Sequence, residues 1–479
     1  MWTFVKEIIT SFRHSPCRGW LAIFLVANLF INLPNNTNPR SRLATLCAMV
    51  EDHSFCIDNY KDLTIDWART PDGHYYSNKA PGPMLLGYPV FWVVDKALTG
   101  HHPDRAARDR LRLEYSWLTF KLLSMLLQVL PFFVLVLMSL RWLEDRGVSR
   151  AALHVSCVAM LFGNTATLFM NTYFGHAMAA NAVLALVLCL LSRQYTGSGL
   201  AFGLALLADY GSAALLPGFA LAVALREPVK GWLGCGGRIA LGALLPAILW
   251  TFYHLTCFAG PFTLPSRYQN PLFVDTARYT ILGIFSLSPD PMVAAKLLVG
   301  FRRGILWSQP WLLVVLAGLL LWRHSLKSMV ASTWTACRPL LLFLLPGFML
   351  LLWMNASFGE WHAGSSPGPR YMCSVFPACG LLAGALYDGL SLFWRRWMVA
   401  TVAFSALYWI TIYSTNHMVP DISLWSHTLG LLFNEPTVGS MCRVIVLVIV
   451  FEWQFLRTWR ECHSTSVTVS RVPSPGDWG

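Results

Sequence analysis

The pattern that most constrains this chain is a succession of apolar runs separated by short, basic turns. A transmembrane helix needs about 20 apolar residues, and fewer suffice where several helices pack together. Because lipid offers the backbone no hydrogen-bond partners, such runs cross a membrane as helices. The sequence therefore predicts an all-α polytopic membrane protein with about 12 transmembrane helices. The predicted spans are 19–33, 115–140, 151–170, 175–192, 198–209, 212–225, 237–258, 305–322, 339–354, 372–390, 397–414 and 439–456.

Composition agrees with this class and argues against nucleic-acid binding. Only 13% of the 479 residues are charged, and the chain carries 21 Trp and 29 Phe. A soluble protein of ordinary composition has about a quarter charged residues. The net charge of +12 is better explained by arginines in cytoplasmic loops that face anionic lipid. Membrane lipids are therefore expected partners, and nucleic acid is not.

The basic turns set the expected orientation. If both termini are cytoplasmic, the Lys and Arg residues between the spans lie on the cytoplasmic side. This requires that the short run 84–98, which contains Asp95 and Lys96, lies on the outer surface instead of crossing, a point that the sequence leaves open. We expect one transmembrane domain, 1–460, and a polar cytoplasmic tail, 461–479. The outer face would carry the loops 34–114, 259–304, 355–371 and 415–438.

The first outer loop is rich in carboxylates. Residues 42–50 have the spacing of a helix that rests on the membrane surface, and Glu51 and Asp52 close it. Asp58 and Asp66 follow. A carboxylate just above the bilayer could act as a general base on an acceptor hydroxyl or amine, or could hold a divalent cation such as Mg²⁺ or Mn²⁺. A solvated acidic loop is the alternative, and metal dependence stays open.

The 12 cysteines show no CxxC motif and no Cys/His spacing typical of a metal site. Several lie inside apolar runs, where a free thiol behaves as a small hydrophobe. Cys47 and Cys56 share the first outer loop and could form a disulfide if that loop is oxidised.

A polar, aromatic stretch, 72–83, ends in Lys79-Ala-Pro-Gly-Pro. A prolyl turn fixes the direction in which the chain returns to the membrane, and it places the lysine ammonium at headgroup depth. This position suits a phosphate ligand, although a lysine that answers bulk lipid headgroups is the alternative. Tyr75 and Tyr76, just before it, are either interfacial belt residues or a platform for a sugar.

Three further groups of polar residues lie at the predicted outer face. His176 stands where two spans meet, and either caps a helix or lines a site. Arg302 and Arg303 break the positive-inside trend, which indicates contact with a phosphate or with lipid headgroups.

The loop 355–371 is the second strong signal. Glu360, His362 and Arg370 lie among glycines, serines and prolines, which allow a ligand to approach the backbone closely. An arginine at the membrane needs an anionic partner. That partner is either Glu360 or, as we prefer, a lipid phosphate.

Taken in order, these motifs resemble a known group. An acidic outer loop is followed by Tyr-Tyr-Ser-Asn-Lys-Ala-Pro-Gly, Tyr-Phe-Gly-His, Arg-Arg-Gly-Ile-Leu-Trp-Ser-Gln-Pro and Pro-Gly-Pro-Arg-Tyr. Over roughly residues 15–390 the chain resembles bacterial polytopic glycosyltransferases of the GT-C fold, related to the protein O-mannosyltransferases and the lipid A aminoarabinose transferases. The resemblance implies that Lys79 contacts a polyprenyl-phosphate donor. The Asp-Glu pair that the family carries after the first span is replaced here by Asn-Asn-Thr-Asn at 35–38.

The resemblance implies an inverting transferase of the bacterial inner membrane that moves a sugar from a polyprenyl-phosphate donor to a lipid, glycan or protein acceptor on the periplasmic face. With the Asp-Glu pair missing, we expect Asp66 as the base, ahead of Asp52, Glu51 and Asp58. Lys79 and Arg370, with Arg302 or Arg303, would hold the phosphate, and Tyr75, Tyr76, His176, Glu360 and His362 would bind substrate. A lipid-linked-sugar flippase is an alternative, for which Asp209 and Lys121 are the main charged residues within the spans. A glycan ligase or polymerase is another.

Overall fold

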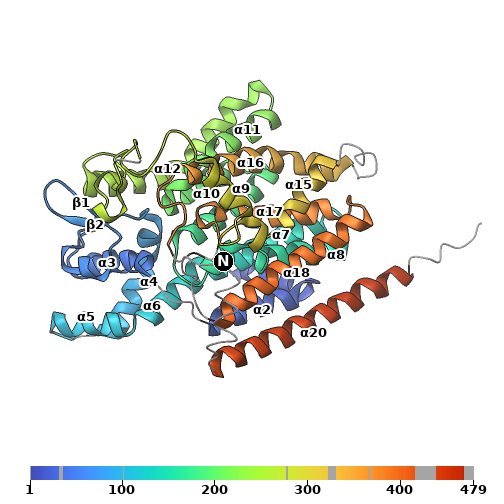
Figure 1. The fold of residues 1–479 in the computed structure, drawn as a ribbon, viewed down its shortest axis with the longest axis horizontal. Helices are drawn as coiled ribbons and strands as arrows, with labels where there is room; N and C mark the ends of the chain where they lie inside the picture. The colour runs from blue at the N-terminus through green and yellow to red at the C-terminus, as the bar shows by residue number, and fades with distance from the viewer. Residues whose placement is uncertain are drawn as a thin grey trace, which may run out of the picture.

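The computed structural model describes residues 2–31, 36–100, 102–276, 279–321, 331–364, 366, 368–415 and 438–468. Asn35, most of the predicted outer segment 415–438 and the end of the predicted tail 461–479 lie outside these residues. The described chain is almost entirely helical, with one small two-stranded sheet (Figure 1).

The elements of the N-terminal part are α1 (Trp2–His14), α2 (Arg18–Phe30), α3 (Thr37–Glu51), η1 (Asp58–Leu63), β1 (Trp67–Arg69), β2 (Tyr75–Ser77), α4 (Gly82–Thr99), α5 (Arg105–Glu114), α6 (Ser116–Ser124), η2 (Met125–Val129) and α7 (Leu130–Glu144). The middle part comprises α8 (Arg150–Leu161), η3 (Thr165–Phe169), α9 (Gly175–Leu191), α10 (Tyr195–Ala208), η4 (Tyr210–Leu215), α11 (Leu216–Arg226), η5 (Val229–Gly231) and α12 (Trp232–Phe258). The C-terminal part comprises η6 (Pro265–Tyr268), η7 (Pro271–Phe273), α13 (Pro291–Val299), α14 (Ile305–Ser308), α15 (Trp311–Leu321), α16 (Ala331–Ala356), η9 (Arg370–Val375), α17 (Phe376–Tyr387), α18 (Leu392–Thr415) and α20 (Val438–Thr468).

Helices of the described chain that are long and apolar enough to cross a membrane number four: Ser116–Glu144, Val229–Phe258, Cys337–Ala356 and Gly439–Cys462. Six shorter apolar helices accompany them. The predicted all-α membrane class is thus confirmed, but the count of about 12 spans is not. The six shorter helices have 10–17 residues, fewer than the about 20 that a lone span needs. One of them, α9, has 17 residues that are nearly all buried inside the molecule.

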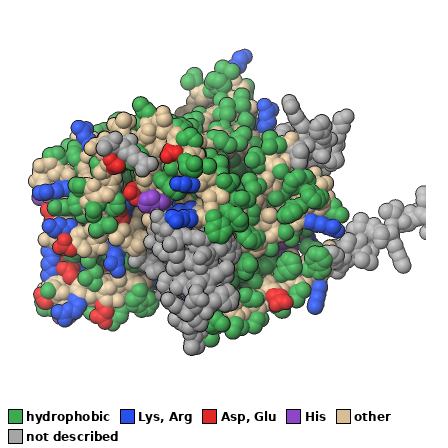
Figure 2. Space-filling model, in the orientation of Figure 1, with side chains coloured by type: hydrophobic (Ala, Val, Ile, Leu, Met, Phe, Trp, Pro, Cys, Tyr) green, Lys and Arg blue, Asp and Glu red, His purple; other side chains and the backbone are tan. Residues whose placement is uncertain are grey.

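The main core lies where α7, α8, α9 and α17 pack together (Figure 1). Helices α10 and α12 pack on one side of it, and α11 packs against α16. Apolar side chains on α12 and α20 point outward; Leu233 is 92% exposed and Trp453 59%. Figure 2 shows hydrophobic side chains over much of the right half of the molecule, while charged side chains gather at the left, over α3–α5. The hydrophobic surface is what lipid would cover.

The first polar loop folds as a small unit of its own. Helix α3 packs against α4, η1 and β2, and the hydrophobic cluster beneath it includes Leu43, Leu46 and Phe91. β1 and β2 pair in antiparallel register, with Trp67 opposite Ser77 and Arg69 opposite Tyr75. We expected α3 to rest on the membrane surface, but its residues 38–48 are buried except for the exposed Arg40, because α4, η1 and β2 pack against it.

The structure also tests the predictions for the run 84–98 and for the pair Cys47 and Cys56. The run 84–98 forms the single helix α4, which is not among the four helices above. Its Asp95 is 1% exposed and faces Arg112 of α5, so this charge is neutralised within the protein. The disulfide that Cys47 and Cys56 could form is absent: within the described residues every cysteine is a free thiol, and Cys47 is buried in the cluster under α3.

Candidate functional site

An ion pair between Asp66 and Lys79 lies at one end of the β1–β2 hairpin. Lys79 Nζ donates to Asp66 Oδ1 at 2.9 Å. Asp66 directly precedes β1 and Lys79 follows β2 by two residues, so the pairing of Trp67 with Ser77 brings the two side chains to the same end. The two strands thus set the geometry of the pair.

Ser41 of α3 ties this end of the hairpin to the rest of the loop. Its hydroxyl lies 2.6 Å from the backbone oxygen of Asp66 and 2.7 Å from the hydroxyl of Ser77. Ser77 Oγ in turn accepts from the backbone N–H of Lys79 at 3.2 Å. The prolines and glycine after Lys79 then begin α4, as the Pro-Gly-Pro sequence predicts.

Burial shapes the charge state of this pair. Asp66 is only 8% exposed. Burial by itself would raise the pKa of Asp66, but the Lys79 ammonium outweighs this effect and holds the pKa below its usual value. Burial also lowers the pKa of Lys79, and Asp66 opposes that change. Asp66 is therefore ionised at neutral pH, and an anion that drew Lys79 away would free it to accept a proton.

Two buried arginines join the pair. Arg370, the first residue of η9, is 7% exposed, and its guanidinium lies over the rings of Phe174 (5.1 Å) and Tyr371 (5.4 Å). Its charge acts on both Asp66 and Lys79. The Nε atoms of Arg370 and of Arg42 have no hydrogen-bond partner within the described part of the chain.

Arg42 comes from α3 and is 3% exposed. One of its guanidinium nitrogens donates to the backbone and side-chain oxygens of Asn38. Burial lowers its pKa to about 10, and its charge interacts with Asp66, Asp209 and Arg370. The sequence pattern does not predict a role for Arg42, because it is typical of a helix on the membrane surface.

His176 and Asp209 complete the cluster. His176 Nδ1 lies 2.7 Å from Asp209 Oδ2, and the His176 ring packs edge-on against Tyr371. Gly175 permits the start of α9 to lie close to Ala208 and Arg42. A Cβ at this position would lie 2.2 Å from the backbone oxygen of Ala208 and 2.9 Å from Arg42 Nη2. Asp209 had been considered only for the flippase alternative, on the signal that a charge inside an apolar run is functional.

The charges of this buried cluster do not cancel. Lys79, Arg42 and Arg370 supply three cations, whereas Asp66 and Asp209 supply two carboxylates. With His176 neutral, the surplus is positive. Desolvated cations with unfilled N–H groups are typical of a site that binds a phosphate or carboxylate.

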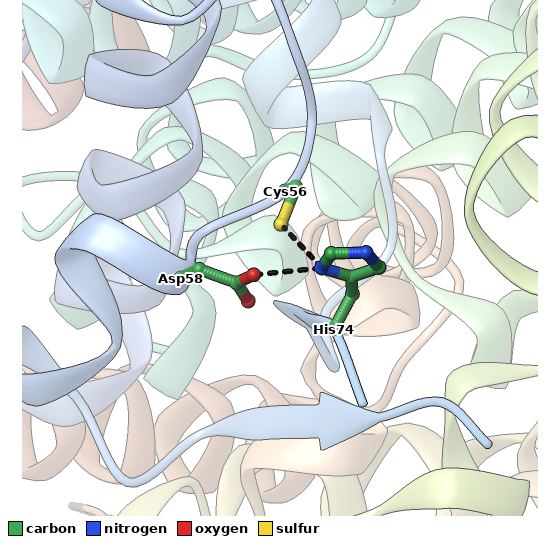
Figure 3. Close-up of side chains that lie close together, drawn as sticks. All are labelled: Cys56, Asp58 and His74. Carbon is green, nitrogen blue, oxygen red and sulfur yellow. Dashed lines mark hydrogen bonds and ion pairs between the residues drawn. The ribbon is translucent and has the colours of Figure 1, made fainter. Parts of the chain in front are cut away.

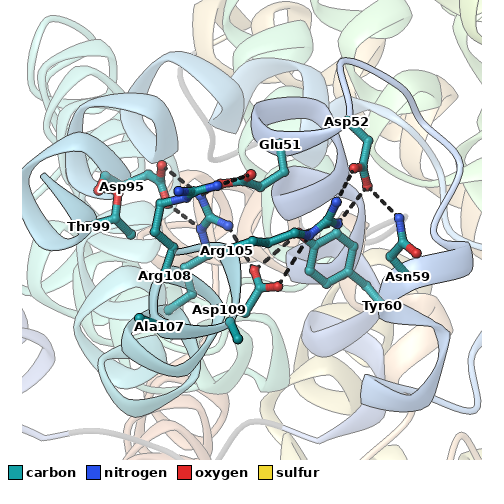
Figure 4. A network of polar contacts seen from close by, with 12 residues as sticks. Glu51, Asp52, Asn59, Tyr60, Asp95, Thr99, Arg105, Ala107, Arg108 and Asp109 are labelled. Carbon is teal, nitrogen blue, oxygen red and sulfur yellow. Dashed lines mark hydrogen bonds and ion pairs between the residues drawn. The ribbon is translucent and has the colours of Figure 1, made fainter. Parts of the chain in front are cut away.

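The other predicted carboxylates lie in a separate ion-pair network with α5 (Figure 4). Arg108 and Arg112 both donate to Glu51 at 2.7 Å. The hydrogen bond from Arg108 is the main reason that the pKa of Glu51 falls to about 2. Asp52 receives a two-pronged contact from Arg105, at 2.8 and 3.2 Å. The carboxylate oxygens of Glu51 and Asp52 thus bind arginines of α5 and do not contact Lys79 in this structure.

Asp58 is also engaged away from Lys79. Its Oδ2 lies 2.7 Å from His74 Nδ1, and its Oδ1 accepts from the backbone N–H of Tyr75 at 2.7 Å. Tyr75 packs edge-on against Trp67, and Tyr76 packs against Phe258. Both tyrosine rings are half-buried and belong to the hairpin that carries the Asp66–Lys79 pair.

The remaining predicted residues have other contacts, although the charge of Glu360 acts on Tyr371. Glu360 and His362 are 3.5 Å apart, so the ion pair that the structure gives Glu360 is with His362 and not with Arg370. Arg302 is exposed, whereas Arg303 is buried and lies near Tyr408 of α18. Neither arginine is placed in the cluster around Lys79.

Lys121, the other charged residue within a predicted span, is held by hydrogen bonds to neighbouring parts of the chain. Its ammonium donates to the backbone oxygens of Asn28 (2.6 Å) and Ile31 (2.8 Å) and to the side chain of Asn171 (2.7 Å). Three donors meet three acceptors, which fills its hydrogen-bonding capacity.

Comparison with known proteins adds one similarity. No known family and no curated protein matches the sequence. The crystal structure of ArnT from Cupriavidus metallidurans bound to undecaprenyl phosphate is similar over 96% of this chain and 77% of that chain, with 15% sequence identity and a TM-score of 0.45. A likeness at this level establishes neither fold family nor function, and we base the function on the geometry of the cluster.

Proposed function

We propose that this protein is a polytopic membrane glycosyltransferase of the GT-C type, which transfers a sugar from a polyprenyl-phosphate donor with inversion at the anomeric carbon. The observation that carries the proposal is the Asp66–Lys79 pair, at 2.9 Å, with Asp66 buried and Lys79 half-buried, in electrostatic contact with Arg42 and Arg370. The acceptor is a hydroxyl or amine of a lipid, glycan or protein, and the reaction takes place on the periplasmic face.

The cation surplus supports a phosphate ligand. Burying three cations among two carboxylates is costly unless an anion joins them. The unfilled Nε atoms of Arg42 and Arg370 offer hydrogen bonds to such an anion. A guanidinium can bind two phosphate oxygens at once, while the Lys79 ammonium adds a point charge.

The chemistry follows from these groups. The donor phosphate attracts Lys79 and so weakens its bond to Asp66. Asp66 then takes the proton from the acceptor hydroxyl or amine as this attacks the anomeric carbon. The bond between the anomeric carbon and the phosphate oxygen breaks, and the polyprenyl phosphate leaves with an added negative charge. Lys79, Arg42 and Arg370 stabilise that charge, which grows in the transition state.

The excess positive charge of the cluster also disfavours binding of a divalent cation there. Mg²⁺ and Mn²⁺ bind through carboxylate oxygens, and the two carboxylates of the cluster already face Lys79 and His176. Leaving-group stabilisation by the lysine and arginines makes a divalent ion in this cluster unnecessary.

The proposal is tested by comparing Lys79→Ala with Lys96→Ala, a matched change at an exposed lysine of α4. Each protein is reconstituted in liposomes with a panel of radiolabelled polyprenyl-phosphate hexoses and pentoses, and release of polyprenyl phosphate is measured. Wild type and Lys96→Ala should release it, and Lys79→Ala should not. Full activity of Lys79→Ala, or a wild type that consumes no donor, would overturn the proposal.

The same liposomes separate the alternative activities. A flippase moves the labelled donor between leaflets without consuming it. A glycan ligase or polymerase consumes it only when a second lipid-linked glycan is supplied. The saturated environment of Lys121 and the pairing of Asp209 with His176 argue against a charged path through the spans.

A further inference from the structure

Cys56, Asp58 and His74 form a second group of chemically active side chains, outside the cluster around Lys79 (Figure 3). One potential ligand atom from each lies within 4.8 Å of the other two. Cys56 Sγ is 3.8 Å from His74 Nδ1, and Asp58 Oδ2 is 2.7 Å from the same nitrogen. The three side chains converge from two chain segments on a partly exposed point of the first polar loop.

Backbone contacts hold the two segments together. The N–H of Ile57, between Cys56 and Asp58, donates to the backbone oxygen of Tyr75 at 2.7 Å. The N–H of Tyr75 in turn donates to Asp58 Oδ1 at 2.7 Å. Both flanks of the group are thus fixed by the fold, so that little entropy is lost when a ligand is bound.

The arrangement does not suit a nucleophilic cysteine. In a Cys–His–Asp relay the thiol and the carboxylate use different ring nitrogens of the histidine. Here both point at Nδ1.

A shared metal ion instead requires donor atoms that surround one point, and one potential ligand atom from each of the three side chains lies within 4.8 Å of the other two. We propose that Cys56, Asp58 and His74 bind a zinc ion through Sγ, Oδ2 and Nδ1. Zinc accepts thiolate, imidazole and carboxylate ligands in one tetrahedral site, with distances of about 2.0–2.3 Å. Neighbouring ligand atoms of such a site are roughly 3.5 Å apart, so the Cys56–His74 separation fits, and the Asp58–His74 contact opens slightly when the ion replaces the shared proton.

The donor set selects among metals. A thiolate with an imidazole favours zinc over Mg²⁺ and Mn²⁺, which prefer oxygen ligands. Three protein ligands leave the fourth position to water, and the partial exposure of His74 and Asp58 gives the ion access from solvent. The sequence did not predict this site, because one ligand lies 16 residues from the nearest of the other two.

The site stands on its own and does not depend on the transferase activity. The bound ion would join residues 56–58 to His74. Strand β2 begins at the next residue, Tyr75, and ends two residues before Lys79. We therefore expect zinc to stabilise the hairpin.

A cobalt titration tests the proposal. Full-length protein in detergent, with any polyhistidine tag removed, is stripped with chelator and titrated with Co²⁺, whose thiolate complexes absorb in the near ultraviolet. One equivalent should give this band, and zinc should remove it. Cys56→Ser and His74→Ala should lose it, while Cys442→Ser, at an exposed cysteine of α20, should keep it. No band in the wild type, or a band that survives in Cys56→Ser, would overturn the proposal.

A second measurement needs no variant and guards against misfolding of the mutants. Alkylation of each cysteine is followed by mass spectrometry in apo protein with and without added zinc. Zinc should slow alkylation of Cys56 by about tenfold or more, since the bound thiolate is shielded. The rate at Cys442 should not change. Equal rates at Cys56 with and without zinc would refute the site.

Discussion

The carboxylate of Asp66 and the ammonium of Lys79 meet at 2.9 Å because the strand pairing of Trp67 with Ser77 joins their chain segments. Thirteen residues separate the two in sequence. Asp66 is buried and Lys79 half-buried, and the charges of the buried Arg42 and Arg370 act on Lys79. The pair is held in place by backbone structure rather than by its own attraction, which leaves the lysine able to exchange its partner for a phosphate.

Replacing Asp66 by Asn should separate catalysis from binding. The variant lacks the proposed base, so transfer should fall by about 100- to 10,000-fold. Binding of polyprenyl phosphate should persist, because Lys79 no longer has a competing carboxylate. Turnover in liposomes and ligand-induced thermal stabilisation in detergent measure the two effects. Asp62→Asn, at an exposed carboxylate of η1, should leave both unchanged. Loss of binding with retained turnover would contradict the assignment.

Arg42→Gln should weaken binding of the polyprenyl phosphate. A hydrogen bond to a charged group is worth about 1.5–3 kcal/mol, which corresponds to roughly 10- to 100-fold in affinity. The matched change Arg40→Gln alters an exposed arginine two residues away and should have no effect. Equal affinities for the two variants, measured with the same lipid, would remove Arg42 from the site.

Glu51 should make the free energy of unfolding depend on pH in the acid range. Chiefly through the hydrogen bond from Arg108, its pKa falls from 4.5 to about 2 in the folded protein. A lowered pKa stabilises the fold above pH 4.5, and the contribution is lost as the pH falls toward 2. Glu51→Gln should therefore cost about 2–3 kcal/mol at pH 7 and progressively less below pH 4.5.

Thermal unfolding of detergent-solubilised protein across this pH range measures the effect. The gap in melting temperature between wild type and Glu51→Gln should narrow as the pH is lowered. Glu144→Gln, at an exposed carboxylate, should track the wild type throughout. A gap that stays constant with pH would show that the ion pairs of Glu51 do not contribute.

Asp95 and Arg112 should behave as a buried pair. Their side chains are 1% and 2% exposed, and their contact is 2.5 Å. Asp95→Asn should lower stability by about 3–5 kcal/mol, because it leaves a buried guanidinium without its main partner. Asp109→Asn removes a more exposed partner of the same arginine, 30% exposed, and should cost less. Combining Asp95→Asn with Arg112→Gln should cost less than the sum of the single changes.

The sequence predicted Lys79 and Arg370 as neighbours of a single anion, and the structure brings both into one cluster with Asp66 and His176. Pro-Gly-Pro motifs made these positions visible, because such turns mark where the chain direction is fixed. The roles of these residues remain predictions.

Other features depend on contacts that sequence does not display. Glu51 and Asp52 have the composition of a catalytic pair, yet their arginines stand 53 to 61 residues away on α5. Arg42 was missed because an amphipathic segment has the same sequence pattern whether lipid or protein covers it. The count of about 12 spans stays a prediction, since hydropathy does not distinguish lipid-facing helices from buried ones.

The close approach at Gly175 has a consequence for sequence divergence. A side chain at this position would displace Ala208 and Arg42 together, and would carry His176 away from Asp209. Most positions of α9 are buried and apolar, and such positions can exchange one aliphatic residue for another of similar volume. Homologues that keep the chemistry should therefore exchange aliphatic residues of similar volume along this helix and yet retain glycine at its first residue, which makes that glycine a marker for recognising distant relatives.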